Sequence, residues 1–322
     1  MSKKVLGINF GRPNGNDEIL LKIALQAARE EGCEVELIRY NDFKILPCTG
    51  CGGCHAPGRG GKCVLKDDNE LMEEHILEAD GIIFASPIYI WGPTGGFTAM
   101  SDRYGPNRDR VLIKWRNGGD MEKVKEAGYD PRMWKERVGA YIAVGGTMNP
   151  NYATMATSLM PCMTHSMQIR VIDELVAIDS TMPGHVCKHP DKLQKAAELG
   201  RNIARSIGLP KEELQWYGDP GTCPYCHHNL FNVDNGSKTV TCCTCGVQGT
   251  VTLNRGRIHV EFDRATQDIR QRETDEEMIS HGIEIADHMQ LWEPNKEKVM
   301  EKLVKYKEYK PTMVKPGPRT NP

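Results

Sequence analysis

Short apolar runs alternate with longer segments of mixed polarity along the first two thirds of the chain. The runs are rich in valine, isoleucine and leucine, and glycine or polar residues bound them. A run of this kind is typical of a strand buried in a parallel sheet. Strands are predicted at residues 3–10, 33–40, 79–86 and 138–146, and within 169–178.

Apolar residues recur at helical spacing between these runs. After the first strand, Ile19, Ile23 and Ala27 lie one turn apart, and Gly32 ends the segment. Five strands alternating with helices predict a doubly wound α/β fold, with a five-stranded parallel sheet and right-handed crossovers. Helices are predicted at residues 17–31, 67–77, 96–103, 152–167 and 192–207.

Changes in composition divide the chain into three parts. An α/β domain is predicted over residues 1–210; it includes a cysteine-rich loop, 47–63, and a charged excursion, 105–135, that interrupts the alternation. Residues 219–262 are rich in turn formers and predict a separate small module. Residues 263–322 form a C-terminal extension that is predicted to be helical over 265–309. A proline-rich tail, predicted to be extended or disordered, follows.

The charge balance and the absence of long apolar runs exclude several classes of protein. The formal charge is 41 − 43 = −2, so the chain lacks the positive charge of a bulk nucleic-acid binder. The start, MSKKVLGINFG, becomes polar too soon for a signal peptide, and no apolar run is long enough to span a membrane. We therefore expect a soluble cytoplasmic protein.

The chain contains twelve cysteines, which are not expected to form disulfides in the reducing cytoplasm. Clustered cysteines in such a protein usually bind metal or take part in catalysis. Cys33, Cys162 and Cys187 are isolated and are expected to be small buried side chains. Eight of the others form two tight groups, at positions 48, 51, 54 and 63 and at positions 223, 226, 242 and 245.

The second group has the spacing C-x2-C-x15-C-x2-C. Two such pairs joined by a hairpin predict a zinc ribbon, in which each pair presents two thiolates to one tetrahedral ion. A rubredoxin-like iron site is the alternative, since four thiolates also bind iron. Cys243 competes for one place, and His227 and His228 are expected to be turn residues. The predicted zinc ligands are Cys223, Cys226, Cys242 and Cys245.

The first group lies in the sequence PCTGCGGCHAPGRGGKC, where the glycines do not suit a regular helix or strand. An iron–sulfur cluster, zinc and a regulatory disulfide are the candidates. Three cysteines at C-x2-C-x2-C spacing fit three corners of a 4Fe–4S cubane, and a flexible loop can bring in the fourth. A single zinc ion more often takes C-x2-C pairs from two places. We therefore favour the cluster.

Three segments follow predicted strands, at the edge where doubly wound sheets bind ligands. INFGRPNGND, residues 8–17, opens a helix, and the backbone N–H groups at a helix start suit a phosphate. ASPIYIWGPTGG, residues 85–96, offers an apolar wall with polar edges. VGGTMNPNY, residues 144–152, carries glycines that let a planar ring approach the backbone.

Several motifs along residues 3–208 occur together: KVLGI in the first strand, PC-x2-C-x2-C, EADGIIFASPIY, the following Asp102-Arg103, and AVGG near the fourth strand. On these motifs the chain resembles the iron–sulfur flavoproteins of the NAD(P)H-dependent FMN reductase superfamily, which have a flavodoxin-like fold. The resemblance implies that FMN phosphate binds at the first loop, through Asn9, Arg12, Asn14, Gly15 and Asn16. It implies a 4Fe–4S cluster on Cys48, Cys51, Cys54 and Cys63. For the flavin ring it implicates Ser86, Pro87, Ile88, Tyr89, Trp91, Gly145, Gly146 and Thr147.

The chain departs from the family pattern in two places. A hydroxyl residue usually ends the first loop, but here Asp17 stands in its place. A carboxylate there repels a phosphate dianion unless Arg12 or another cation compensates, and an ordinary helix N-cap is its alternative role. The last spacing of the first cysteine group is eight residues, whereas the family has four to seven. A glycine-rich loop absorbs one extra residue.

The resulting hypothesis is a flavin-dependent oxidoreductase that uses FMN and a 4Fe–4S cluster. Electrons would come from NAD(P)H or ferredoxin and pass to a small-molecule or protein acceptor. The resemblance also implies a homo-oligomer, a dimer or tetramer, with FMN near a subunit interface. Two alternatives remain open. One is an FMN reductase with zinc in place of the cluster, and the other is a redox-responsive zinc-ribbon interaction protein. Nucleic acid is not favoured as its partner, because residues 219–262 are not notably basic.

Overall fold

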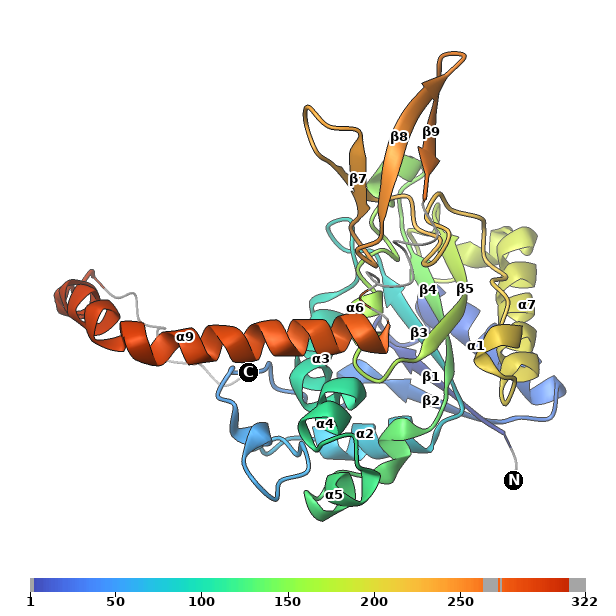
Figure 1. Cartoon of the computed structure of the whole chain (residues 1–322). Helices are drawn as coiled ribbons and strands as arrows, with labels where there is room; N and C mark the ends of the chain where they lie inside the picture. The colour runs from blue at the N-terminus through green and yellow to red at the C-terminus, as the bar shows by residue number, and fades with distance from the viewer. Residues whose placement is uncertain (1–2, 263–271, 273, 313–322) are drawn as a thin grey trace.

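A computed structural model of the chain describes residues 3–262, 272 and 274–312. Five parallel strands form the main sheet in the order β2-β1-β3-β4-β5, which confirms the predicted five-stranded α/β fold (Figure 1). Consecutive strands run parallel because a helical crossover returns the chain to the same edge each time. The strands are β1 (Lys4–Asn9), β2 (Glu34–Arg39), β3 (Gly81–Pro87), β4 (Val138–Val144) and β5 (Arg170–Ala177).

Helices cover both faces of this sheet. On one face, α1 (Asn16–Glu30) and α7 (Pro190–Ser206) lie side by side. On the other face lie α2 (Asn69–Glu78), α3 (Gly95–Arg108) and the short α6 (Pro161–Thr164). Short 3-10 turns occur at Tyr40–Asp42, Gly53–His55, Pro131–Trp134, Pro150–Tyr152, His185–Lys188 and Lys211–Glu213.

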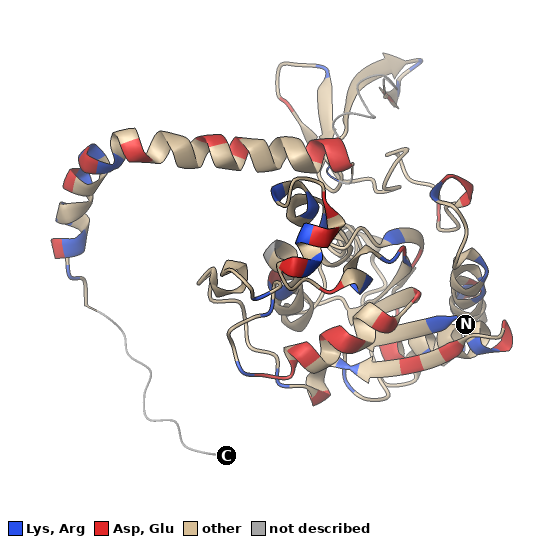
Figure 2. Cartoon of the chain, turned by 60° about the horizontal axis from the view of Figure 1, so that its bottom comes forward, with Lys and Arg blue, Asp and Glu red and all other residues tan. Residues whose placement is uncertain are grey.

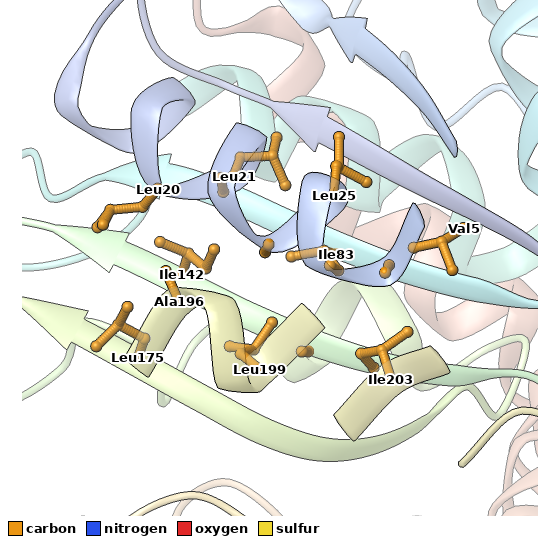
Figure 3. Packing of buried hydrophobic residues seen from close by; sticks show 14 of the residues in the cluster. Val5, Leu20, Leu21, Leu25, Ile83, Ile142, Leu175, Ala196, Leu199 and Ile203 are labelled. Atoms are coloured by element: carbon orange, nitrogen blue, oxygen red, sulfur yellow. The ribbon is translucent and has the colours of Figure 1, made fainter. Parts of the chain in front are cut away.

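Alternate residues of each strand enter opposite core layers, as the period of two along a strand requires. From β3, Ile83 packs under α1 and α7, whereas Phe84 packs under α2 and α3. Figure 3 shows the first layer, in which Leu21 of α1 and Leu199 of α7 point toward the sheet. These side chains are fully or almost fully buried, so both helices are held by apolar contact.

The two helices on this face approach each other unusually closely at Gly200. A Cβ atom at this position would overlap the backbone carbonyl of Ala24 in α1. Glycine costs helix stability in the interior of α7, but here it lets the two helix backbones come into contact. This contact fixes the height at which α1 lies over the sheet, and therefore the position of its first turn.

The prediction of a helix at residues 152–167 is wrong. The segment forms a 3-10 turn, a series of turns and only one short helix, α6. Pro161 lacks the backbone donor that a continuous helix needs, and threonine and serine precede it. Met160, Met163 and Met167 are nevertheless buried in the core, because flexible methionine side chains fill space without a regular helix.

The excursion at residues 105–135 consists of the end of α3, α4 (Arg110–Arg116), α5 (Met121–Glu126) and a 3-10 turn. It does not lie over the carboxyl ends of the strands. It packs instead on α2 and on the cysteine loop, around a small core of Leu77, Ile113, Val124 and Met133.

A second, antiparallel sheet projects from one end of the α/β body (Figure 1). Its strands are β6 (Phe231–Val233), β7 (Thr239–Cys242), β8 (Gln248–Asn254) and β9 (Arg257–Glu261). The long helix α9 (Asp275–Glu308) then leaves the body and extends into solvent (Figure 1). The predicted helical residues 265–271 and 273, and the tail from 313 onward, lie outside the described residues.

Within residues 3–262 and 274–312, none of the helices combines the length and the apolar character needed to cross a bilayer.

We expect Gly200→Ala to lower the free energy of unfolding by about 2 to 3 kcal/mol, because a methyl group must push α7 away from the α1 backbone. Chemical denaturation would measure the change. Gly95→Ala is the matched control, since nothing lies within 4 Å of a Cβ at that position. The control should stay within about 0.5 kcal/mol of the parent. Equal stability of the two variants would contradict the close approach.

Candidate functional site

Three loops meet at the carboxyl edge of the sheet, because β1, β3 and β4 are neighbours and run in the same direction. They are the loop before α1, the turn after β3 and the glycine loop after β4. The segment that follows β5 ties them together. The backbone N–H of Ser180 donates to Gly145, and the side chain of Thr181 donates to the carbonyl of Gly146. The structure thus brings together the three segments that the sequence analysis singled out.

The first loop folds tightly around the side chain of Asp17. A Cβ at Gly11 would overlap this carboxylate, and a Cβ at Gly15 would lie 2.5 Å from it. The carboxylate accepts the backbone N–H groups of Asp17 and Glu18 at the start of α1. It therefore occupies the place at the helix N-terminus that suits an oxyanion.

Asp17 is held there without full compensation of its charge. Its side chain is buried, and its Oδ2 atom has no hydrogen-bond partner. Burial raises the pKa of Asp17 to about 6, and the two backbone N–H groups offset this only in part. Arg12, the cation that the sequence analysis named, lowers the pKa slightly from an exposed position.

The neighbouring carboxyl group, Glu18, has the opposite environment. Arg39 binds it through two hydrogen bonds of 2.8 Å, and Lys22 approaches to 2.6 Å. These contacts, with that of Arg39 the largest, lower the pKa of Glu18 to about 2 although the side chain is fully buried. Arg39 and Lys22, two cations close to the loop, are thus used by Glu18. No local sequence pattern predicts the Arg39–Glu18 pair, because Arg39 comes from β2 and Glu18 from α1.

Two predicted phosphate ligands have structural partners in this structure. The amide of Asn16 donates to the carbonyls of Ser180 and Met182, at 2.7 and 2.8 Å, and accepts the N–H of Val186. The amide of Asn9 donates to the Gly11 carbonyl and to Glu18 at 3.4 Å. These amides hold the loop in shape. Asn14 is exposed and has a positive φ of 57°.

The turn after β3 presents apolar side chains to solvent. Tyr89 and Gly92 exchange backbone hydrogen bonds, and the two residues between them have positive φ angles, 48° at Ile90 and 70° at Trp91. A β-branched residue rarely adopts such a conformation, and this strain is found most often at functional sites. Tyr89 is 62% exposed, Ile90 84% and Trp91 50%. Tyr89, Ile90 and Trp91 therefore form a strained, exposed apolar surface, the shelf.

The residues before the shelf fix its position. Ser86 is buried, accepts the N–H of Thr94 and donates to the carbonyl of Pro87. Ile88 packs against Gly145, where a Cβ would lie 3.2 Å from its Cδ1 atom. Thr147 binds Asn149 within its own loop. The glycine loop thus lies directly beside the turn after β3.

The cysteine loop is anchored to the body by a buried ion pair. Arg103 of α3 binds Asp67 at 2.6 Å and the carbonyl of Leu46 at 2.7 Å, and both charged side chains are almost fully buried. Residues 46 and 67 flank the loop, so one guanidinium group closes it. Asn107 donates to the carbonyl of Gly61 farther along. Arg103, which belongs to the Asp102-Arg103 motif of the resemblance, therefore holds the cysteine loop in place in this structure.

The four thiols of this loop lie near one another but are not gathered as ligands. Burial raises the pKa of Cys54, and negative charge on Cys63, Cys48 and Cys51 adds to this. A backbone N–H at Gly53, and then Thr49, lowers the pKa of Cys51. The cluster on these four residues stays a prediction.

A cavity of about 700 Å³ lies between the cysteine loop and the second sheet. Its lining includes Leu159, which also lies next to the turn after β3, against Gly92. The cavity therefore adjoins both the shelf and the loop. Among the other lining residues are Cys48, Ser101, Asp102, Cys162, His165 and Cys243.

The second cysteine group forms a compact set of four thiols, all within 4.8 Å of one another. The sulfur atoms of Cys223 and Cys245 are 3.5 Å apart, and those of Cys226 and Cys242 are 3.4 Å apart. Tetrahedral zinc with bonds of about 2.3 Å requires sulfur atoms about 3.8 Å apart, so the spacing suits such an ion. Within residues 3–262, 272 and 274–312, no other group of three or more potential metal ligands lies so close together.

The remaining candidates around this group have other roles. Cys243 is exposed and lies outside the set of four. His227 stacks on Trp216 at 4.4 Å, and His228 is buried beside Glu174. Burial lowers the pKa of His228 to about 4. Arg272 binds the backbone carbonyls of Cys243 and Cys245, which attaches the chain just before α9 to the second cysteine pair.

Comparison with known proteins places this edge of the sheet in context. The family model described as NADPH-dependent FMN reductase matches residues 4–182, which contain β1 to β5 and all three loops. The chain belongs to this family. It is therefore a flavin-dependent oxidoreductase.

Relatives extend the likeness over different parts of the chain. An iron–sulfur flavoprotein of Methanocaldococcus jannaschii is 32% identical over 216 residues, which are 65% of this chain and 100% of that protein. A flavone synthase of Aspergillus candidus is 27% identical over 276 residues, 80% of this chain and 81% of that protein. The solved structure of a flavone reductase, 27% identical, covers 97% of this chain and 100% of its own, with a TM-score of 0.81.

The residues at the carboxyl edge fit FMN with one condition. The first loop fits an oxyanion, because the buried carboxylate of Asp17 already occupies it. One oxygen of this carboxylate, Oδ2, has no hydrogen-bond partner. The shelf at Tyr89 and Trp91 fits a flat ring. The condition is that the Asp17 carboxyl group must turn away or take up a proton, since two adjacent anions repel.

The first site prediction concerns the pH dependence of FMN affinity. The pKa of Asp17 lies above the usual value for aspartate, so the proton that relieves the repulsion is bound below about pH 6 and lost above it. We expect Asp17→Asn to bind FMN about 10- to 100-fold more tightly than the parent at pH 8, and equally at pH 5. Titration of cofactor-free protein with FMN, followed by flavin fluorescence, would measure both affinities.

The control for this prediction is Asp42→Asn, which changes an exposed carboxylate near the same loop. It should follow the parent at every pH. The ratio of affinities also cancels the titration of the phosphate itself, which has a second pKa near 6 and acts equally on all three proteins. A ratio that does not change with pH would contradict the role of Asp17.

Proposed function

We propose that the chain is an FMN-dependent reductase of flat aromatic compounds that carry a carbon–carbon double bond conjugated to a carbonyl group. The observation that carries the proposal is the strained, exposed shelf at Tyr89, Ile90 and Trp91 beside the anion loop. A flat apolar surface at this place suits both a flavin ring and a flat substrate. Two relatives named for flavone chemistry, one with the same whole-chain architecture, support this class of substrate.

FMN would lie along the three loops of the carboxyl edge. The first loop, with Arg12, Asn14 and the start of α1, would hold its phosphate. Ser86, Ile88 and the glycine loop would support the ring from below, and Tyr89 and Trp91 would flank it. When bound, this cofactor supplies hydride transfer and single-electron transfer.

The chain's own residues would orient the substrate and exclude water. The side chains of Tyr89 and Trp91 would pack against its flat face, and the strained backbone at Ile90 would keep them from collapsing onto the sheet. Reduction of a conjugated double bond also needs one proton at carbon. The phenol of Tyr89 is the exposed donor on the shelf and is the residue we assign to this step.

A 4Fe–4S cluster on Cys48, Cys51, Cys54 and Cys63 would connect the flavin to an electron donor such as ferredoxin. Several curated relatives are iron–sulfur flavoproteins, which supports the assignment. The Arg103–Asp67 pair holds both ends of the loop, so only residues 48–63 would need to rearrange around the cubane. NAD(P)H is the alternative donor, as the family description indicates.

Zinc at Cys223, Cys226, Cys242 and Cys245 would have a structural role. Four thiolates complete a tetrahedral site and leave no position open for substrate. The sheet around them is small, and its apolar core consists mainly of these cysteines with Val247 and a few aromatic side chains. Such a small module needs the metal for its stability.

The first test of the function is an anaerobic assay with NADPH or reduced ferredoxin as donor and flavone as acceptor. We expect Trp91→Ala to raise the KM for flavone about tenfold or more, because it removes half of the shelf. Flavin content should be measured in parallel, since a loss of FMN would show that Trp91 serves the cofactor rather than the substrate.

The matched control is Tyr309→Ala, which removes an exposed aromatic side chain at the C-terminal end of α9. It should leave the KM unchanged. Absence of flavone reduction by a protein that carries one FMN per chain would overturn the substrate class and leave the flavin site intact.

The second test concerns the first cysteine group. Anaerobically purified protein should contain about four irons and four sulfides per chain in addition to one zinc. Cys51→Ala should lose the iron and sulfide but keep the zinc and the flavin. Cys187→Ala should keep all of them, because Cys187 lies outside both groups and is exposed, not buried as the sequence predicted. Two zinc ions and no iron in the parent protein would favour the FMN reductase without a cluster.

A further inference from the structure

Helix α9 carries an apolar stripe that continues far beyond the body of the molecule. At alternating intervals of four and three residues, the stripe consists of Met278, Gly282, Ile285, Met289, Trp292, Lys296, Val299, Leu303 and Tyr306. Only Lys296 interrupts its apolar character. An uninterrupted 4-3 spacing is the repeat with which one helix packs along another.

The first two residues of the stripe pack against another helix. Met278 and Gly282 are buried against the chain's own α4. A Cβ at Gly282 would lie 2.6 Å from Leu112 and 3.2 Å from Trp115, so glycine allows a close helix crossing here. Beyond this crossing the same stripe has no partner within the described residues, and every residue from 287 to 312 is exposed.

The exposure of the outer stripe is too large for a helix that is stable alone. Met289 is 70% exposed, Trp292 43% and Tyr306 65%. Most helices in proteins are stabilised by packing of an apolar face and not by helix propensity. Pro294 lies inside the helix and weakens it further. The outer part of α9 therefore needs a surface that continues the contact begun on α4.

The charges of α9 identify the partner. Residues 275–293 carry six acidic side chains and no lysine or arginine, whereas residues 294–308 carry five lysines and three glutamates. Figure 2 shows this asymmetry, with red alone along the first half of α9 and blue appearing only in the second half. A second copy of the same helix, laid antiparallel, would place each acidic half against a basic half.

We propose that α9 is a dimerisation arm that pairs antiparallel with α9 of a second copy of this chain. With the twofold axis near Pro294, Ile285 of one copy would face Leu303 of the other, and Met289 would face Val299. Trp292 would face Lys296, an arrangement that suits a cation and an aromatic ring. The one polar member of the stripe therefore has a partner in this register, and the interface is isologous as a twofold dimer requires.

The same charges argue against other occupants. A helix that lies on a membrane surface is typically rich in lysine and arginine along its polar face, but the first half of α9 has neither. The stripe is also self-complementary about its middle, which an interface with an unrelated protein does not require. This pairing is independent of the flavin chemistry proposed above.

In the first experiment, light scattering at micromolar concentration measures the mass of the full-length parent protein and of two double variants. Met289→Glu with Leu303→Glu places charge on the stripe. Leu291→Glu with Val304→Glu places the same charge on exposed apolar residues of the same helix that lie off the stripe. We expect the first pair to halve the mass relative to the parent and to weaken association about 100-fold or more, and the second pair to leave both unchanged.

The outcomes of this comparison are distinct. A parent protein that does not associate through α9, so that neither double variant changes the mass, overturns the proposal. Equal loss of association in both variants also overturns it, because the stripe would then have no special role. Unchanged flavin content and circular dichroism in both variants would show that the body is still folded.

A second measurement tests the orientation without destabilising the helix. Met289→benzoylphenylalanine introduces a photo-crosslinker, and light and isotope-labelled chains are mixed before irradiation. We expect crosslinked peptides between chains that join position 289 to residues near 299. Crosslinks to residues near 289 of the second copy would show parallel pairing. That result, or crosslinks within one chain only, would overturn the proposal.

Discussion

The contact between α1 and α7 determines where the functional edge of the molecule lies. Gly200 lets the two backbones touch, and this contact fixes the height of α1 above the sheet. The amide of Asn16 then ties the first turn of α1 to the backbone after β5, at Ser180 and Met182. The N-terminus of α1 is therefore held from two directions, and the N–H groups that would bind an anion are fixed before any anion arrives. A site prepared in this way loses little entropy when it is filled.

Two neighbouring carboxyl groups at this edge show how local pairing decides the state of a buried acid. Glu18 is fully buried, yet its pKa is lowered, because Arg39 and Lys22 satisfy both of its oxygens. Asp17 has only backbone donors for one oxygen, and its pKa is raised. The two pKa values differ because the carboxyl groups have different hydrogen-bond partners, since both groups are buried. Since Glu18 takes the nearby cations, Asp17 retains a protonation equilibrium close to neutral pH.

The sequence predicts those features that depend on local periodicity or fixed spacing. The five strands and the helices α1, α2, α3 and α7 follow from their apolar patterns, and the four-thiol site follows from its paired C-x2-C spacing. The prediction fails at residues 152–167, where methionines imitate a helical stripe and Pro161 prevents the helix. The Arg103–Asp67 and Arg39–Glu18 pairs could not be predicted, because each joins elements that are far apart in sequence. The shelf was located, but the strain at Ile90 depends on backbone angles that no residue pattern specifies.

The arm has a mechanical consequence that its chemistry alone does not suggest. At 1.5 Å per residue, the 34 residues of α9 measure about 50 Å along the helix axis, which bends in its outer part (Figure 1). A tilt of about 5° at its root moves a point about 30 Å along the helix by about 2.5 Å, which is comparable to the radius of a side-chain contact. The root is held by Gly282 against α4 and, through Arg272, by the carbonyls of the second cysteine pair. The position of the small thiol-rich module therefore helps to set the angle at which α9 leaves the body.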